Sequence, residues 1–236
     1  MVETGKATSE LRLQSGVNMV LDSGTRGQIY RDYLVLERGT GQVSNAANYR
    51  IKARSLQVEP VSEGAAKVTV LREGNGIRVA ALGGGIRVRN TRGVLLADVP
   101  AGKSLTFEQQ EGGASGPAKL TGVITKKNGR YFLTDETAGV TVELQGPGLD
   151  KQVGKKVTVT GVIDPTGNPA EGASQVVRVS QVSVIGAAGA GAATAAGHGA
   201  GLAIGTKAVI AGVVVAGAAT GTAVGLTRDE KPPISQ

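Results

Sequence analysis

The residues of this chain that could do chemistry are few. The sequence has no cysteine and a single histidine, His198, which lies among glycines and alanines. This composition excludes thiolate nucleophiles, disulfides and zinc–thiolate sites, and it leaves no basis for a Ser-His-Asp triad. Catalysis would depend on carboxylates, lysines and hydroxyls alone. We predict that the protein is not an enzyme and that it has no catalytic residue, no cofactor and no metal site.

One acidic turn still needs to be weighed, because Asp22-Ser23-Gly24-Thr25 follows the apolar run Met19-Val20-Leu21. It resembles the active-site turn of retroviral-type aspartic proteases, in which two such aspartates from a dimer share a proton. Here Arg26 follows directly, and no later apolar-apolar-glycine segment supports such a loop. Common turn residues produce this pattern easily, so we interpret it as a turn that ends a strand. A protease acting through Asp22 is kept as a remote alternative.

A second motif, Gly102-Lys103-Ser104, ends like a phosphate-binding loop. The complete pattern needs a glycine at position 97, which is Ala97, and a helix after the motif. A strand pattern follows instead, over residues 105–107. We interpret this segment as a turn before a strand, without a role in phosphate binding.

Cations and aromatic rings occur together at one predicted hairpin, where Lys126, Lys127 and Arg130 flank Tyr131 and Phe132. Lys126, Lys127, Arg130 and Tyr131 are the candidate residues for a weak ligand surface. The whole chain has only six aromatic residues, four Tyr and two Phe, too few for a stacking platform. The net charge of +7 resides mainly in residues 1–101, so the region around the hairpin is close to neutral. Nucleic-acid binding is therefore not favoured.

The first 108 residues show the pattern of an antiparallel β domain. Apolar and polar residues alternate over short runs, and turn residues recur every eight to twelve positions. Tyr49, Ile51 and Ala53 point to one face, and the phase of the alternation changes at Ser55, which predicts a β-bulge. Gly-rich and Asn-Gly links between later runs are typical of hairpin turns.

A second, smaller β unit is predicted over residues 118–185, after a polar linker over 109–117. Five strand patterns occur in it, with a hairpin turn at Lys127-Asn128-Gly129. The only place for a helical turn, residues 148–154, lies between the third and fourth strands. This order matches a five-stranded OB-like barrel. The predicted fold class is therefore mainly β, with two antiparallel β domains and one C-terminal transmembrane helix.

The helix prediction concerns the last fifty residues. Residues 186–206 form a Gly/Ala-rich low-complexity segment, residues 207–228 are predicted to be a transmembrane helix, and 229–236 a polar tail. Between Lys207 and Arg228 lie 20 uncharged residues, enough to cross a hydrocarbon core of about 30 Å. Small residues that recur every four positions would let two such helices pack closely. These residues are Ala208, Gly212, Ala216, Gly217, Gly221 and Gly225.

This interpretation implies a location and partners. The cations that follow the span outnumber Lys207 before it, which favours a single-pass protein of the cell membrane with its β domains on the periplasmic side. The expected partners are the membrane, a second copy through the transmembrane helix, and other envelope proteins. No export signal is visible at Met1-Val2-Glu3. We therefore expect either an earlier start of the chain or an anchor at its tail.

Residues 1–108 resemble the FecR-type domain of bacterial envelope proteins. The resemblance rests on Val2-Glu3-Thr4-Gly5, on 34–39 with Gly41-Gln42-Val43, on 49–53, and on Gly85-Ile86-Arg87-Val88 leading to 99–103. It implies a non-catalytic β structure outside the cytoplasmic membrane, which in some members relays a signal to a sigma factor. Members usually carry earlier strands and an export signal, so the resemblance implies that this chain lacks its first strands.

Two hypotheses of different classes remain. The first is a non-enzymatic, membrane-anchored envelope protein with a structural or signal-relaying role. The second is a soluble OB-type module that binds an oligonucleotide or an oligosaccharide. The residues alone do not identify a ligand for either hypothesis.

Overall fold

The computed structural model describes residues 1–46, 48–61, 66–109, 117–164, 166–185, 207–210 and 213–217. The prediction of a mainly β protein is confirmed, since the described residues form nineteen strands and one short 3-10 helix, η2 (Leu149–Gln152). The strands of the first unit are β1 (Val2–Glu3), β2 (Ser9–Arg12), β3 (Asn18–Leu21), β4 (Arg26–Ile29), β5 (Tyr33–Ser44), β6 (Arg50–Ala53), β7 (Leu56–Pro60), β8 (Lys67–Glu73), β9 (Gly76–Gly83), β10 (Ile86–Asn90), β11 (Leu95–Val99) and β12 (Ser104–Gln109). The later strands are β13 (Ala118–Lys127), β14 (Arg130–Thr134), β15 (Thr141–Gln145), β16 (Lys156–Asp164), β17 (Val176–Val184), β18 (Lys207–Ile210) and β19 (Val213–Gly217).

The first unit consists of two sheets that share the long strand β5. One sheet runs in the order β1-β4-β5-β6-β7-β10-β11, and the other contains β2-β3-β5-β8-β9-β12. The two halves of β5 meet at Gly39, whose φ of 81° lies in the left-handed region. A Cβ there would lie 2.7 Å from the Cα of Thr25, so both the backbone conformation and the close approach require glycine.

The core of this unit follows from the two-residue period of its strands. Leu34 and Leu36 in β5 and Ile86 and Val88 in β10 are fully buried, while the residues between them are partly exposed. Each such aliphatic side chain contributes about 1.5–3 kcal/mol when it is removed from water. Alternation therefore accounts for which face of each sheet is inside.

The bulge predicted at Ser55 is wrong. Residues Arg54 and Ser55 form a two-residue turn that joins β6 and β7 as an antiparallel hairpin, with Ala53 paired to Leu56. Arg54 has a φ of 50°, which a tight hairpin turn demands. The change of phase thus marks the point where the chain reverses. Ala53 and Leu56 are paired across two turn residues, so the apolar positions change from odd to even numbers.

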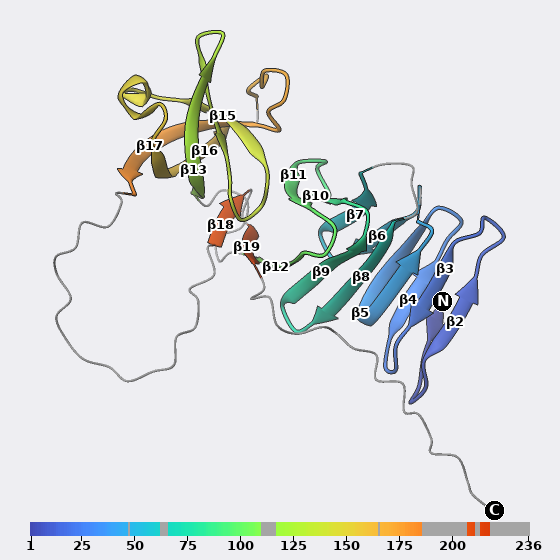
Figure 1. Cartoon of the computed structure of the whole chain (residues 1–236). Coiled ribbons are helices and arrows are strands. Elements are labelled where there is room, and N and C mark those ends of the chain that lie inside the picture. The colour runs from blue at the N-terminus through green and yellow to red at the C-terminus, as the bar shows by residue number, and fades with distance from the viewer. Residues whose placement is uncertain are drawn as a thin grey trace, which may run out of the picture.

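Strands β13 to β17 close into a barrel (Figure 1). Pairing runs in the cycle β13-β14-β15-β17-β16 and returns to β13, with β15 and β17 parallel and every other pair antiparallel. The helix η2 lies between β15 and β16. Gly122 allows β13 to bend, because a Cβ there would collide with the carbonyl oxygen of Thr134.

The predicted transmembrane helix is wrong for the described residues between 207 and 217. These residues form β18 and β19, which pair with each other; β19 also pairs with β12, and β18 meets β13 at Lys119. Figure 1 shows both strands between β12 and the barrel. Their buried side chains alternate, which is the period of a strand. The reason is that β-branched residues fit an unpaired strand edge well, whereas glycines weaken a helix.

This correction removes Ala208, Ala216 and Gly217 from the predicted helix packing face. Gly212, Gly221 and Gly225, with residues 218–236 and 186–206, lie outside the described residues, and so do residues 110–116 of the predicted linker over 109–117, whose first residue, Gln109, ends β12. Across the part of the chain that the structure covers, no helix has the length and apolar character needed to cross a membrane.

Candidate ligand-binding cleft

A cleft with a volume of about 450 Å³ opens on the outside of the barrel. One wall comes from the turn between β13 and β14, and the other from the loop between β16 and β17. The residues that line it are Lys127, Asn128, Arg130, Phe132, Asn168, Pro169, Ala170 and Glu171. The cleft therefore combines cations, amides, one acid and an aromatic ring.

The first wall is a tight hairpin turn. Asn128 and Gly129 have φ values of 50° and 76°, the two positive angles that a two-residue hairpin turn requires. Lys127 pairs with Arg130 across this turn, so both side chains project from the same face of the ribbon. The hairpin was predicted correctly from Asn128-Gly129, and it places two cations at the entrance of the cleft.

The second wall is held by a buried carboxylate in β15. The side chain of Glu143 is only 4% exposed. Its Oε2 accepts hydrogen bonds from the backbone N–H of Ala170, at 2.8 Å, and from Nη1 of Arg130, at 3.1 Å. Nε2 of Gln145 donates to Oε1 at 3.3 Å. Glu143 thus binds the loop on one side and the hairpin on the other.

The charge state of Glu143 follows from these contacts. Burial by itself would raise the pKa of Glu143, but the N–H of Ala170, the amide of Gln145 and the guanidinium of Arg130 outweigh it, so the pKa is lowered. Glu143 is therefore an anion at neutral pH, and it holds the positively charged Arg130 in one position at the cleft. The ion pair thus joins a buried carboxylate to a guanidinium whose side chain is 52% exposed.

Both ends of the loop are anchored to the barrel. At its start, the Asp164 carboxylate accepts the hydroxyl of Thr166 at 2.8 Å and Nη2 of Arg178 at 2.7 Å. Hydrogen bonds from Thr166 and then from Arg178 lower the pKa of Asp164. At its end, the N–H of Ser174 donates to the carbonyl of Thr141 at 2.8 Å. The wall is therefore attached at its start, middle and end.

The four predicted surface residues divide into two groups. Lys127 and Arg130 line the cleft. Lys126 pairs with Tyr131 across the hairpin, and its ammonium lies 5.2 Å from the centre of the Tyr131 ring, outside the cleft lining. Phe132 lines the cleft and is 8% exposed. Alternation along β14 explains this division, because Arg130 and Phe132 share one face and Tyr131 has the other.

Sequence reasoning missed Glu143 and the loop residues of the cleft. Glu143 lies between Val142 and Leu144, so alternation predicts an outward and exposed side chain. It is buried because the loop between β16 and β17 folds over it. No local pattern could show that contact, since Glu143 and Ala170 are 27 residues apart.

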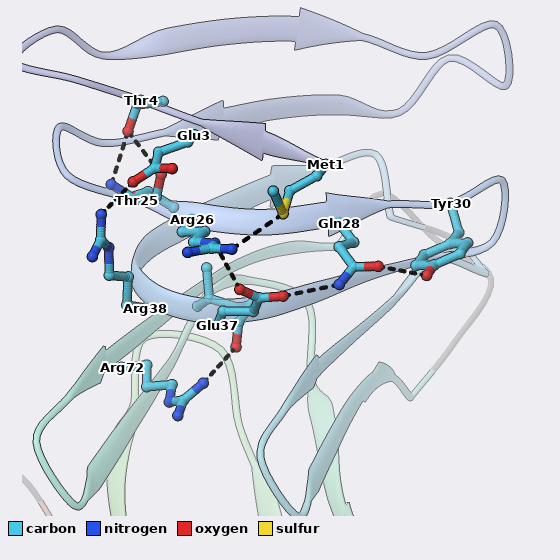
Figure 2. A network of polar contacts seen from close by, with 11 residues as sticks. Met1, Glu3, Thr4, Thr25, Arg26, Gln28, Tyr30, Glu37, Arg38 and Arg72 are labelled. Carbon is cyan, nitrogen blue, oxygen red and sulfur yellow. Dashed lines mark hydrogen bonds and ion pairs between the residues drawn. The ribbon is translucent and has the colours of Figure 1, made fainter.

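The acidic turn at Asp22 lies in the first unit, between β3 and β4, and its contacts are those of a structural turn. The Asp22 carboxylate accepts the N–H of Ser23 at 2.7 Å and the hydroxyl of Thr8 at 3.3 Å. Thr25 donates its N–H to the hydroxyl of Thr4 at 2.8 Å and its own hydroxyl to the carbonyl of Thr40 at 3.1 Å. Figure 2 shows Thr4 and Thr25 in this network.

The turn at Gly102-Lys103-Ser104 uses its backbone N–H groups internally. The N–H of Gly102 donates to the carbonyl of Ala81 at 2.7 Å, and the N–H of Lys103 to the carbonyl of Pro100 at 3.1 Å. Strand β12 follows directly. These donors are therefore engaged within the protein, which agrees with a turn that does not bind phosphate.

Comparisons with known proteins identify no family for this chain. No protein-family model matches it, and neither does any curated protein. Two crystal structures, at 1.65 and 2.50 Å resolution, of a protein from Parabacteroides distasonis ATCC 8503 described as an anti-sigma factor are similar to it, with TM-scores of 0.37 and 0.36. They are 12% and 14% identical to it and cover 46% and 45% of the chain, and the chain covers 54% of each. The chain thus spans about half the length of these structures, and likeness at this level carries no argument about function.

Proposed function

We propose that the barrel formed by β13 to β17 is an OB-type binding module whose cleft takes an anionic oligomer, either a single-stranded oligonucleotide or an acidic oligosaccharide. The order of strands supports this proposal. Five strands that close through one parallel pair, with the helical element between the third and fourth, match the OB barrel. Barrels of this class bind ligands on the face of the second and third strands, between the loop after strand one and the loop after strand four.

The observation that carries the proposal is the place of the cleft. Its lining residues belong to the end of the first strand, to the loops after the first and fourth strands, and to the second strand of the barrel. A cleft of about 450 Å³ accommodates one nucleotide or one to two sugar rings of a longer chain. The oligomer would continue along the barrel surface on either side.

The lining has two cations, Lys127 and Arg130, and one acid, Glu171, and this small surplus of positive charge supports an anionic ligand. Lys127 contributes one cation, and Arg130 presents guanidinium N–H groups beyond the Nη1 that contacts Glu143. Glu143 neutralises part of the charge on Arg130 but also fixes its direction, which lowers the entropic cost of binding. Asn128 and Asn168 add amide donors and acceptors that could read sugar hydroxyls or base edges.

A titration tests this function. The full chain is titrated into a fluorescein-labelled dT12 strand and, separately, a labelled oligogalacturonate, both at low salt. Lys127→Glu reverses a charge in the cleft and should weaken binding of the preferred probe at least tenfold. Lys151→Glu, an exposed residue of η2 outside the cleft lining, is the matched control and should bind like the wild type.

The two probes also separate the two ligand classes. The logarithm of the association constant for dT12 should fall linearly with the logarithm of the salt concentration, with a slope of about −0.7 for each phosphate contacted. Failure of both probes to bind the wild-type protein would contradict the proposed function. So would equal binding by Lys127→Glu and the wild type.

A non-enzymatic role in the bacterial envelope stays a prediction from the FecR-type resemblance of residues 1–108. Binding of an oligomer by the barrel is compatible with it, because a structural or signal-relaying protein of the envelope needs a recognition element. The test is fractionation of the cells that make the protein, with recovery in the envelope fraction as the expected result.

A further inference from the structure

Two of the four tyrosines form an exposed stack on the first unit, away from the barrel. The ring centres of Tyr30 and Tyr33 lie 4.5 Å apart with an angle of 20° between the ring planes. The Lys52 ammonium lies 3.9 Å from the centre of the Tyr33 ring. Because Tyr30 already occupies one face of Tyr33 at stacking distance, Lys52 covers the opposite face. The order is therefore cation, ring, ring, and the far face of Tyr30 ends the stack.

The Tyr30 ring is held in place by a row of polar contacts, which Figure 2 shows in sequence. The Tyr30 hydroxyl donates to Oε1 of Gln28 at 2.8 Å, and Nε2 of Gln28 donates to Oε1 of Glu37 at 2.9 Å. Glu37 in turn pairs with Nε of Arg26 at 3.0 Å. These contacts fix the direction of the ring before any ligand binds.

The backbone of Tyr30 is fixed as well. The buried Tyr49 hydroxyl donates to the carbonyl of Tyr30 at 3.1 Å. Burial and then the charge of Asp32 raise the pKa of Tyr49 to about 12, so this donor keeps its proton at physiological pH. Nevertheless, Tyr30 itself is 43% exposed. A large aromatic residue is thus held rigidly while much of its surface faces water.

Cations outnumber acids near this stack. Arg50 is the register partner of Tyr33 in the parallel pair of β5 and β6, and Lys52 is the partner of Val35, so both lie on the outer face of the sheet with Tyr33. Arg31 and Asp32 are both exposed between Tyr30 and Tyr33 in the sequence, and Glu37, which contacts Gln28, is paired with Arg26. The charge around the stack therefore favours an anion and disfavours a cationic ligand.

We propose that Tyr30, Tyr33, Arg50 and Lys52 form a second binding surface, for a nucleotide, in which an unpaired base stacks on the exposed Tyr30 ring and the neighbouring cations attract its phosphate. A fixed tyrosine face beside cations is the arrangement by which proteins bind unpaired bases. The number of aromatic residues predicted no stacking platform, but the fold brings two of them together. This surface is independent of the barrel cleft.

Binding is measured with a fluorescein-labelled dT8 strand by anisotropy at low salt, using the full chain. Loss of one stacked base costs about 1–3 kcal/mol, so Tyr30→Ala should weaken binding roughly 5- to 150-fold once the barrel cleft has been disabled by Lys127→Glu. Tyr30→Phe keeps the ring and should bind within about threefold of the wild type. Leu82→Ala removes another exposed apolar side chain of the same unit, 51% exposed, and should have no effect.

A second readout locates the contact. A strand with 5-iodouracil is crosslinked by light, the protein is digested with trypsin, and the modified peptide is identified by mass spectrometry. Cleavage after Arg26 and Arg31 releases Gly27–Arg31, in which Tyr30 is the only tyrosine. Crosslinking to this peptide supports the proposal. Competition by adenosine monophosphate would show that a free nucleotide suffices, and competition by unlabelled strand alone that a polymer is needed.

The same titrations are repeated in the Lys127→Glu variant, so that failure of the barrel cleft does not obscure the result. A Tyr30→Ala effect that persists in that background belongs to the first unit. The proposal is overturned if the Lys127→Glu variant does not bind dT8, if adding Tyr30→Ala to that variant changes its binding by less than twofold, or if the crosslink maps only to the barrel.

Discussion

Arg130 and Glu143 lie on neighbouring strands of the barrel, and Nη1 of Arg130 donates to Oε2 of Glu143 at 3.1 Å. The acid is buried and the cation faces the cleft. The same Glu143 oxygen accepts the N–H of Ala170, so this one carboxylate connects both walls of the cleft. The stability of the barrel and the shape of its cleft are therefore coupled through Glu143.

Replacement of Glu143 by Gln should destabilise the protein. An amide accepts fewer hydrogen bonds than a carboxylate and leaves Arg130 without its counter-charge, so the free energy of unfolding should fall by about 1–3 kcal/mol. Urea denaturation followed by circular dichroism measures this change. Glu136→Gln is the matched control, because Glu136 pairs with Lys156 at the surface, with 40% of its side chain exposed, and should change stability by less than about 1 kcal/mol.

The effect of Glu143→Gln should also depend on pH. The pKa of Glu143 is lowered in the folded protein, so its contribution to stability is present above the usual value of 4.5 and is lost as the pH falls through the folded-state pKa. The difference in unfolding free energy between the wild type and the variant should shrink as the pH falls from 7 toward 3. A difference that stays constant over this range would show that Glu143 does not act through its charge.

Asp135, in the turn between β14 and β15, should show the opposite pH dependence. It is 1% exposed, and burial raises its pKa even though the N–H groups of Ala138, Thr121 and Thr137 oppose that effect. Its protonated form is favoured in the folded state, so its contribution is greatest at low pH and declines as the pH rises through 3.8 to the raised value. Unfolding of Asp135→Asn between pH 3 and 7 should show an advantage of the wild type that decreases with rising pH.

Gly122→Ala should strongly destabilise the barrel. The added Cβ would collide with the backbone carbonyl of Thr134, which cannot move without disturbing β14, so we expect a loss of about 1–3 kcal/mol or more. Gly76→Ala is the control, since its Cβ would meet the carbonyl of Glu73 at an ordinary 3.7 Å. Thermal unfolding of both variants tests the prediction, and equal melting temperatures would contradict it.

The pairing of β12 with β19 can be trapped by a disulfide. Thr106 and Ala216 are register partners, and partners in an antiparallel pair have the Cα separation that disulfides need. The chain has no cysteine, so oxidised Thr106→Cys with Ala216→Cys should give a single intrachain bond, seen as a shift on a non-reducing gel. Glu108→Cys with Ala216→Cys places the thiols two positions out of register and should oxidise much more slowly. If both pairs react alike, the register is different.

Much of the fold could be predicted from local patterns, because each depends on neighbouring residues alone. Alternation between Leu34 and Leu36 indicates a strand with one buried face, and Asn128-Gly129 indicates a hairpin because both residues accept positive φ. The same reasoning failed at Ser55, where a change of phase has two explanations, a bulge or a reversal of the chain. Only the pairing of β6 with β7 distinguishes them.

The amino-acid sequence by itself determined that the chain is built from strands, that thiol chemistry is absent, and where Lys127 and Arg130 enter a hairpin. The tertiary structure decided the rest. It folded a distant loop over Glu143, stacked Tyr30 on Tyr33, and placed residues 207–210 and 213–217 beside β12 rather than in a helix. These outcomes depend on contacts between residues far apart in the chain. An apolar segment forms a strand where it can pair with the free edge of a sheet, and local sequence does not show where that edge is.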